Sequence, residues 1–347
     1  HRMEHTRGRR PGPRQGDRRS VKNPAEPRPP HALLRLGIAA PFVLVALIWG
    51  STWYVITGQI AEVPPSWSVA YRFAIAAPAM FALAIATGKP LAIGRNGHLL
   101  ALALGAFQFC GNFNFVYRAE EHLTSGIVAV MFALLMVPNA LLALVLLGQR
   151  ITPRFIEGSA VAIAGVALLL VEEARAVRLA GDVPLGVALT VGGIISASLA
   201  NVLQANETGR ALPMFSLLAW AMLYGALIDT ALAWATAGPP VFPQSGAFWA
   251  GTAWLALAGS VVTFPLYYGI VRAIGPGRAA YNGVLVVVIA MLISTFVEGY
   301  AWSPLAAAGA VLGMAGMIVA LRAREAPAAS AGDAKAQSLS SDTSPSR

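Results

Sequence analysis

The stretch Leu123–Leu147, LTSGIVAVMFALLMVPNALLALVLL, contains 25 residues and no charged side chain. A helix needs roughly 20 apolar residues to cross the hydrocarbon core of a bilayer, so this stretch predicts a membrane span. Nine further apolar runs of similar length lie on either side of it. They cover residues 36–59, 66–87, 98–117, 155–172, 184–205, 213–236, 247–271, 277–297 and 303–321. We therefore predict ten transmembrane helices joined by short loops.

The composition agrees with an integral membrane protein and excludes an ordinary soluble enzyme. Of the 347 residues, 56% are hydrophobic and only 12% are charged, whereas a soluble domain carries about a quarter charged residues. Residues 1–35 hold ten basic and three acidic side chains and therefore contribute most of the net charge of +9. We predict that residues 1–35 and 322–347 are disordered tails and that lipid surrounds the body between them.

The distribution of Lys and Arg predicts the orientation of the chain in the membrane. With the N-terminus inside, 21 of the 25 basic residues fall on the inner side. The outer loops contain Arg118, Arg175 and Arg178, and Arg72 lies within the second span. Because basic residues accumulate in cytoplasmic loops, both termini are predicted to be cytoplasmic, in a bacterial-type plasma membrane. The first 35 residues show no classical signal peptide.

An internal repeat predicts how the spans are organised. PNALLALVLLGQ at residues 138–149 matches VVIAMLISTFVE at residues 287–298, an offset of 149. Each half then contains five spans, and an odd number forces the second half to cross the membrane in the opposite sense. The predicted fold is thus an all-α membrane protein of two inverted five-helix repeats, residues 36–172 and 184–321, joined by an outer connection at 173–183. This construction is typical of secondary transporters.

Several short motifs occur in the same order in a known family. In the first half they are Trp49-Gly50-Ser51-Thr52-Trp53, Arg72-Phe73, Tyr117 to Gly126, and Pro138. In the second half they are Gly259-Ser260, the run Gly275 to Tyr281, and Glu298-Gly299-Tyr300. Over Leu36–Leu321 the sequence resembles the EamA-type branch of the drug/metabolite transporter superfamily. The resemblance implies ten helices and the export of amino acids, related metabolites or drugs.

Two positions depart from the pattern of this family. The glutamate that the family commonly places at the end of the fourth span is Gln149, and the proline expected near position 287 is Val287. Glu298 occupies the position equivalent to the missing glutamate. These departures leave open whether transport is coupled to protons or proceeds as uniport.

Ionisable side chains within spans are costly and therefore mark candidate sites. Asp229, in the seventh span, binds a cation or a proton if it faces the interior; alternatively it reaches a vestibule or the headgroups. Arg72 holds a substrate carboxylate, or its long side chain snorkels to the outer headgroups. Glu298, at the outer end of the ninth span, is the third candidate for coupling or charge.

Polar and aromatic side chains at helical spacing predict a largely uncharged binding cavity. The predicted substrate contacts are Trp49, Thr52, Trp53, Gln108, Asn112, Asn201, Ser260, Thr263 and Tyr267. Such a cavity, between spans 1, 3, 4, 6, 8 and 9 as in the resembled fold, suits amphipathic or zwitterionic small molecules. The alternative for each residue is hydrogen bonding and packing between helices.

Backbone features suggest where helices bend and pack. Pro138 is expected to kink the fourth span and to free the carbonyl of Leu134. Gly309 and Gly313 form a small-xxx-small pair that serves either a homodimer or packing within one chain. The chain is therefore expected to be a monomer or a homodimer.

Other chemistries lack the residues they need. The five histidines lie in the tail or at span ends, the chain has one cysteine, Cys110, and Asp229 has no second intramembrane aspartate. We therefore expect no metal or other cofactor, no enzymatic activity and no nucleic-acid partner. The sequence favours a secondary transporter of small molecules. A membrane receptor or scaffold remains the alternative, followed by a membrane-embedded enzyme.

Overall fold

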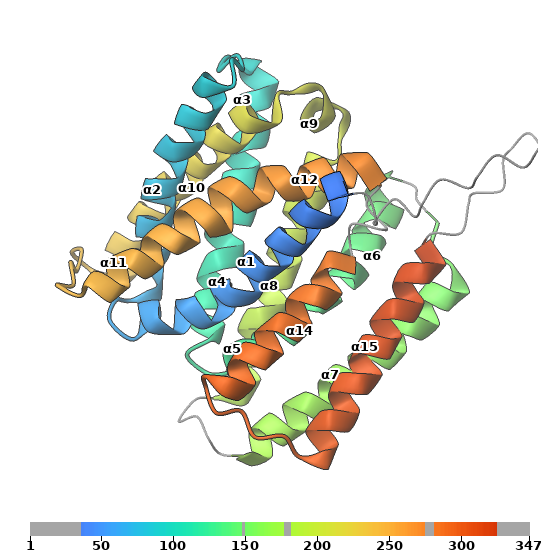
Figure 1. The fold of residues 1–347 in the computed structure, drawn as a ribbon. Coiled ribbons are helices and arrows are strands. Elements are labelled where there is room, and N and C mark those ends of the chain that lie inside the picture. The colour runs from blue at the N-terminus through green and yellow to red at the C-terminus, as the bar shows by residue number, and fades with distance from the viewer. Residues whose placement is uncertain (1–35, 148–149, 177–181, 275–280, 325–347) are drawn as a thin grey trace, which may run out of the picture.

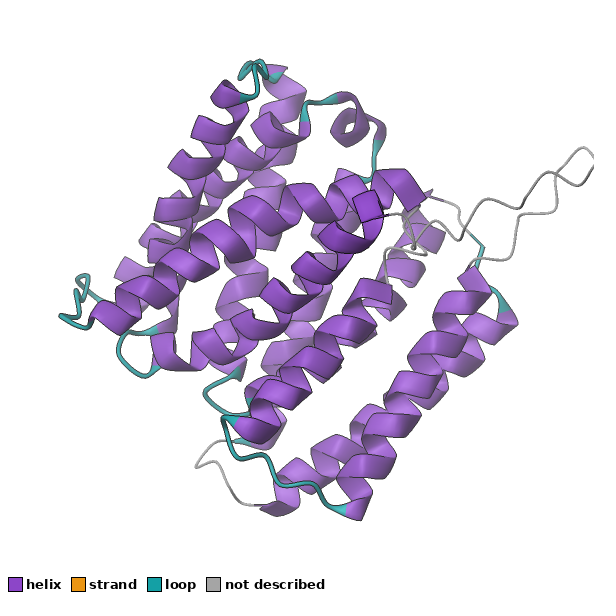
Figure 2. Ribbon diagram, in the orientation of Figure 1, coloured by secondary structure: helices purple, strands orange, loops and turns teal. Residues whose placement is uncertain are grey.

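The computed structural model describes residues 36–147, 150–176, 182–274 and 281–324, and every regular element in these ranges is a helix (Figure 2). The predictions for most of the two tails, for Gln149 and for the run Gly275–Ala280 lie outside the described residues. The proposed boundary at residue 321 falls within a helix that continues to Arg324.

The helices follow the predicted spans closely. In the first half they are α1 (Leu36–Ile60), α2 (Pro65–Ala86), α3 (Gly94–Leu104), η2 (Gly105–Asn112), α4 (Phe113–Ala119), α5 (Ser125–Phe132), η3 (Ala133–Leu135), α6 (Met136–Leu147) and α7 (Pro153–Ala176). In the second half they are α8 (Val183–Gln204), α9 (Glu207–Ala211), α10 (Met214–Ala237), α11 (Gly246–Ala253), η4 (Trp254–Val262), α12 (Thr263–Ile274), α14 (Tyr281–Phe296) and α15 (Pro304–Arg324).

Within the described residues, nine helical stretches are long and apolar enough to cross a membrane. Three of them are composite, since Gly94–Ala119, Ser125–Leu146 and Gly246–Ile270 each join several elements end to end. The predicted ninth span corresponds to α14, a shorter apolar helix of 16 residues, and its predicted first residues, 277–280, lie outside the described residues. The chain is therefore an all-helical, multi-span membrane protein.

Pairs of helices from the two halves hold the bundle together (Figure 1). α2 packs against α10 at one side, α7 packs against α15 at the other, and α1 contacts both α12 and α14 between them. The buried apolar core runs along the same path, from Phe73 and Phe109 to Met291. Each of these contacts joins an element of the first half to one of the second.

Glycines allow α7 and α15 to approach backbone to backbone. A Cβ at Gly316 would overlap the backbone nitrogen of Ala162, and one at Gly165 would overlap that of Gly313. Gly309 lies in the same seam, where an added Cβ would be 2.8 Å from the carbonyl oxygen of Gly165. The small residues at 309 and 313 therefore serve packing within one chain.

Three interruptions divide the long helices. The third and eighth spans contain the π-helical segments η2 and η4, whose first residues, Gly105 and Trp254, are 149 positions apart. Both spans were predicted as uninterrupted α-helix, whereas a π turn pairs residues five apart and rotates the side chains that follow. In the fourth span, a 3₁₀ turn covers Ala133–Leu135. In an uninterrupted α-helix, the ring of Pro138 would clash with the carbonyl of Leu134, which lies in this turn.

Candidate functional site

The carbonyl of Gly259, in the π segment η4, lies at the centre of a buried cluster of polar groups. It accepts hydrogen bonds from Trp49 Nε1 at 3.3 Å, Arg72 Nη2 at 3.4 Å and Thr263 Oγ1 at 2.8 Å. The donors come from α1, α2 and α12. We call Trp49, Arg72, Gly259, Ser260 and Thr263 the Gly259 cluster. All five were quoted as motif or candidate residues in the sequence analysis.

Arg72 is the charged member of the Gly259 cluster, and it is only 2% exposed. Its Nε donates to Ser260 Oγ at 3.2 Å, and its Nη1 donates to the Tyr117 hydroxyl at 3.3 Å. The guanidinium also lies over the Phe113 ring, 4.2 Å from the centroid. The snorkelling alternative is therefore wrong, because α2 turns this residue inward, where hydroxyls and a carbonyl take the place of headgroups.

All three hydrogen-bond acceptors of Arg72 are neutral. A guanidinium has five N–H donors and matches the geometry of a carboxylate. Within the described residues, the site therefore presents a buried positive charge whose hydrogen bonds carry no compensating negative charge. Chemically, such a group can bind an anionic group of a small molecule.

Gly259 permits the close approach of the surrounding side chains. A Cβ at this position would lie 2.9 Å from Thr52 Cγ2 and 3.4 Å from Arg72 Nη2. Thr52 is buried, and its hydroxyl donates to the carbonyl of Trp49 in its own helix at 2.7 Å. Thr52 therefore contributes packing at the cluster, with its hydroxyl already engaged.

Aromatic rings flank the Gly259 cluster. Trp49 contacts Tyr267 with a centroid distance of 5.1 Å and Phe264 with one of 5.8 Å. Trp53 lies one turn along α1 and contacts Phe132 at 5.4 Å. Rings from α1, α12 and α5 thus form a wall that suits the apolar part of an amphipathic molecule.

The remaining amide candidates lie beside α8 instead. Asn201 donates to Asn139 Oδ1 at 3.4 Å, which joins α8 to α6. Asn112 is buried at the contact with Gly193 of α8, and Gln108 is half-buried in η2. The structure therefore brings Trp49, Ser260, Thr263 and Tyr267 together and places the amides in a second group.

Asp229 faces the interior and not the headgroups. Its side chain is 0% exposed, and its Oδ1 accepts a hydrogen bond from Asn114 Nδ2 at 2.8 Å. Its Oδ2 has no hydrogen-bond partner within the described chain. Sequence reasoning missed Asn114, although its polarity in an apolar span was a signal that it shares with Asn112.

Glu298 follows α14, at the end of the bundle that the sequence predicts to be the outer one. It is half-buried, and its Oε2 accepts a hydrogen bond from Ser125 Oγ, at the start of α5, at 2.6 Å. Ser125 is itself buried. The contact ties the end of the ninth span to the start of the fourth.

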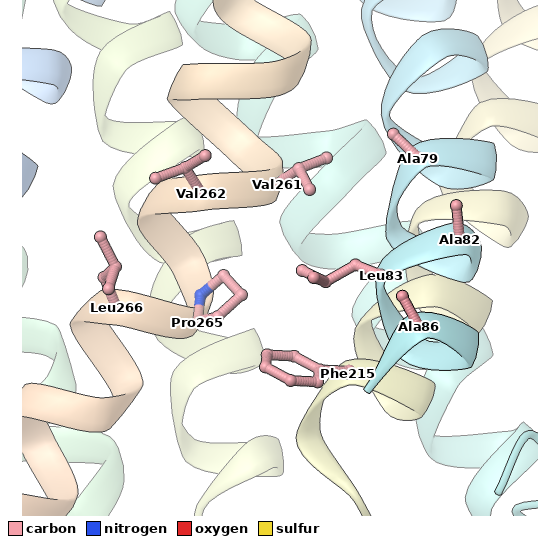
Figure 3. Close-up of a pocket in the computed structure, with 9 residues that line it drawn as sticks. All are labelled: Ala79, Ala82, Leu83, Ala86, Phe215, Val261, Val262, Pro265 and Leu266. Atoms are coloured by element: carbon pink, nitrogen blue, oxygen red, sulfur yellow. The ribbon is translucent and has the colours of Figure 1, made fainter. Parts of the chain in front are cut away.

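A separate groove of about 610 Å³ runs between α2 and the helix formed by η4 and α12 (Figure 3). It is lined by Ala79, Ala82, Leu83, Ala86, Phe215, Val261, Val262, Pro265 and Leu266. No predicted site residue belongs to this lining, and all of the side chains are apolar. The groove therefore suits hydrocarbon rather than a polar group.

Over the described ranges, no three His, Cys, Asp or Glu side chains are grouped to hold a metal ion.

The fold and these buried polar clusters define a multi-span α-helical membrane protein with functional groups inside the bundle. The sequence model of the EamA-like transporter family matches residues 37–171 of this chain, the first of the two predicted halves. This match agrees with the motifs quoted above for the EamA-type branch.

Relatives extend the similarity over both halves. The chain is 24% identical to Protein PagO of Salmonella typhimurium, over 78% of this chain and 88% of that protein. It is 29% identical to the probable terminal-alkyne amino-acid exporter of Streptantibioticus cattleyicolor, over 70% of this chain and 80% of the exporter. A crystal structure with 20% identity superposes with a TM-score of 0.60 and covers 84% of this chain and 99% of the other, which supports the fold.

Proposed function

We propose that this protein is a secondary transporter that exports small amphipathic or zwitterionic organic molecules across the bacterial inner membrane, with both termini cytoplasmic. The observation that carries the proposal is the Gly259 cluster, where a buried guanidinium, hydroxyls and aromatic rings from several spans converge. A receptor, scaffold or enzyme has no evident need for such a cluster at the junction of both halves. Substrates are then amino acids, related metabolites or drugs.

Alternating access of two inverted repeats is the proposed mechanism, and the helix pairing supports it. α2 and α10 occupy equivalent places in the two halves, as do α7 and α15, and each packs against its counterpart. In addition, the Phe107 carbonyl in η2 accepts a hydrogen bond from Ser196 of α8 at 2.8 Å. This contact mirrors that of Trp49 in α1 with Gly259 in η4.

The proposed substrate position follows from the chemistry of the Gly259 cluster. Arg72 binds a carboxylate, Ser260 and Thr263 supply hydroxyls, and Trp49 and Tyr267 contact the apolar part. Trp53, Gln108, Asn112 and Asn201 line the path along α8 and the fourth span. The relative that is named as a probable amino-acid exporter supports both a carboxylate substrate and outward transport.

Flux into and out of proteoliposomes tests the proposal. A panel of radiolabelled amino acids, first narrowed by a growth screen with toxic analogues, supplies the probes. Tyr267→Leu, and the double variant Asn112→Leu with Asn201→Leu, should lower flux at least tenfold. Tyr54→Leu is the matched control, because Tyr54 is 38% exposed on the same bundle. Unchanged flux in the first two variants would reject the proposed site, and no flux of any probe would favour a receptor or scaffold.

A further inference from the structure

Glu120 is a buried carboxyl group that the transport proposal does not use. It follows directly after α4, just beyond the third span, and is 6% exposed. Neither Oε1 nor Oε2 has a hydrogen-bond partner in the described part of the chain. Leaving a carboxylate buried without donors is costly, so the ionised form of Glu120 is strongly disfavoured in this conformation.

Glu298 is held in a fixed position beside this residue. α14 is followed by a turn in which Gly299 has φ +72° and Tyr300 N donates to Ser294 O at 3.0 Å. The hydrogen bond from Ser125 Oγ at 2.6 Å fixes the carboxylate itself. The Glu298 carboxyl group is therefore fixed in position near Glu120.

Close packing of the outer helix ends keeps the site dry. A Cβ at Gly126 in α5 would lie 2.8 Å from Met291 Sδ and 2.9 Å from Ser294 Cβ of α14. A Cβ at Gly186 in α8 would lie 2.6 Å from Leu123 Cγ, in the turn that follows Glu120. The fourth, sixth and ninth spans therefore seal the turn that contains Glu120.

The other ionisable groups near Glu120 have different partners or face away. Arg118 of α4 donates to Ser66 Oγ at 3.5 Å, and His122 Nδ1 accepts from the backbone N–H of Asp182, which precedes α8. Tyr117 accepts from Arg72, and Glu121 is exposed. Burial, and then the charge of Glu298, raise the pKa of Glu120 well above its usual range.

We propose that Glu120 and Glu298 form a proton-binding site at the outer face, which holds one proton while the outer helix ends are packed together and releases it to external water when they separate. The proton leaves a carboxyl group, and the pair changes from one negative charge to two. The inference rests on the proposed alternating access. It makes the external proton the ligand that favours closure of the outer side.

Proton binding can be measured on the purified protein without a substrate. Because the pKa of Glu120 is raised in the folded state, stability is greatest at low pH and falls as the pH rises from the usual carboxyl range through the raised value. Glu120→Gln cannot ionise and should not show this fall. It should unfold about 2–4 °C above the parent protein at alkaline pH, and at the same temperature at low pH.

The adjacent, exposed Glu121→Gln is the matched control and should follow the parent at every pH. Glu298→Gln should reduce the difference, because it removes the second cause of the raised pKa. In a potentiometric titration, the difference between the curves of the parent protein and of Glu120→Gln should show one group that titrates above the usual carboxyl range. A difference confined to the usual range, or identical unfolding profiles, would overturn the site. If sodium raises the unfolding temperature more than choline does, and this effect is lost in Glu120→Gln, the site binds a metal cation and not a proton.

Gly126→Ala tests the link to closure, since its Cβ should separate α5 from α14 and move the titration to lower pH. An unchanged titration in this variant would overturn that link. If Glu120 titrates in the usual carboxyl range while amino-acid flux is intact, the proton site alone is rejected. If Glu120 titrates at raised pH but no probe is transported, the transport proposal is rejected instead.

Discussion

At the scale of single residues, Arg72 differs from a simple buried charge because its three hydrogen bonds to the described part of the chain use three separate nitrogens. Lysine keeps the charge and lacks the planar arrangement of donors. We therefore expect Arg72→Lys to lower substrate flux at least tenfold while the protein still inserts and folds, as judged by its elution as a single species. Arg118→Lys is the control, since the contact of Arg118 with Ser66 Oγ is long, at 3.5 Å. Full flux in Arg72→Lys would mean that a positive charge alone suffices.

Asp229 allows a second prediction at this scale. Asp229→Asn keeps an oxygen for Asn114 Nδ2 and removes a carboxylate from a fully buried position, so thermal unfolding at neutral pH should occur at the same temperature or higher. Asp229→Leu removes one of the two oxygen acceptors of Asn114 Nδ2, leaving only the Cys110 carbonyl, and should destabilise by about 1–3 kcal/mol. A lower unfolding temperature for Asp229→Asn would show that the folded state requires the ionised carboxylate.

The residues that could be predicted were those whose chemistry is unusual for their surroundings. Arg72, Asp229 and Ser260 stand out in apolar spans, and the structure places all three inside the bundle. Asn139 and Glu120 were not singled out, because their importance depends on which side chain faces them across another helix. The rotation of one helix about its axis relative to its neighbours is not contained in the local spacing of a single sequence.

At the scale of elements, the α7–α15 seam predicts a contrast between two glycines on one helix. A Cβ at Gly316 would overlap the backbone of Ala162, whereas a Cβ at Gly313 would meet no atom closer than 3.9 Å. Gly316→Ala should therefore destabilise by about 1–3 kcal/mol, and Gly313→Ala should have little effect. Thermal unfolding in detergent measures both. Equal effects of the two substitutions would contradict the described seam.

Element boundaries also show what local sequence can determine. The apolar runs located the spans to within a few residues, and Pro138 indicated the place where the 3₁₀ turn interrupts the fourth span. The π segments η2 and η4 had no such signal, because neither contains a proline. Their wider turns are set by contacts between spans, such as the bond from Ser196 to the Phe107 carbonyl.

At the scale of the whole molecule, the proposed inverted threading of the two halves makes a prediction that packing alone does not. The loops at 87–93 and 238–245 join equivalent helices, α2 to α3 and α10 to α11, yet should lie on opposite sides of the membrane. Lys89 and Gln244 are exposed in these loops. The chain has one cysteine, which is buried, so Cys110→Ala gives a background for single-cysteine labelling.

In that background, Gln244→Cys should react with a membrane-impermeant maleimide in intact cells, and Lys89→Cys should react only after the cells are permeabilised. The reason is that five spans separate the two positions, and an odd number of crossings reverses the side. Glu121→Cys, in an outer turn of the first half, serves as a positive control that belongs to the same repeat as Lys89. If Lys89→Cys and Gln244→Cys react from the same side, the repeats are parallel, and alternating access of inverted halves must be abandoned.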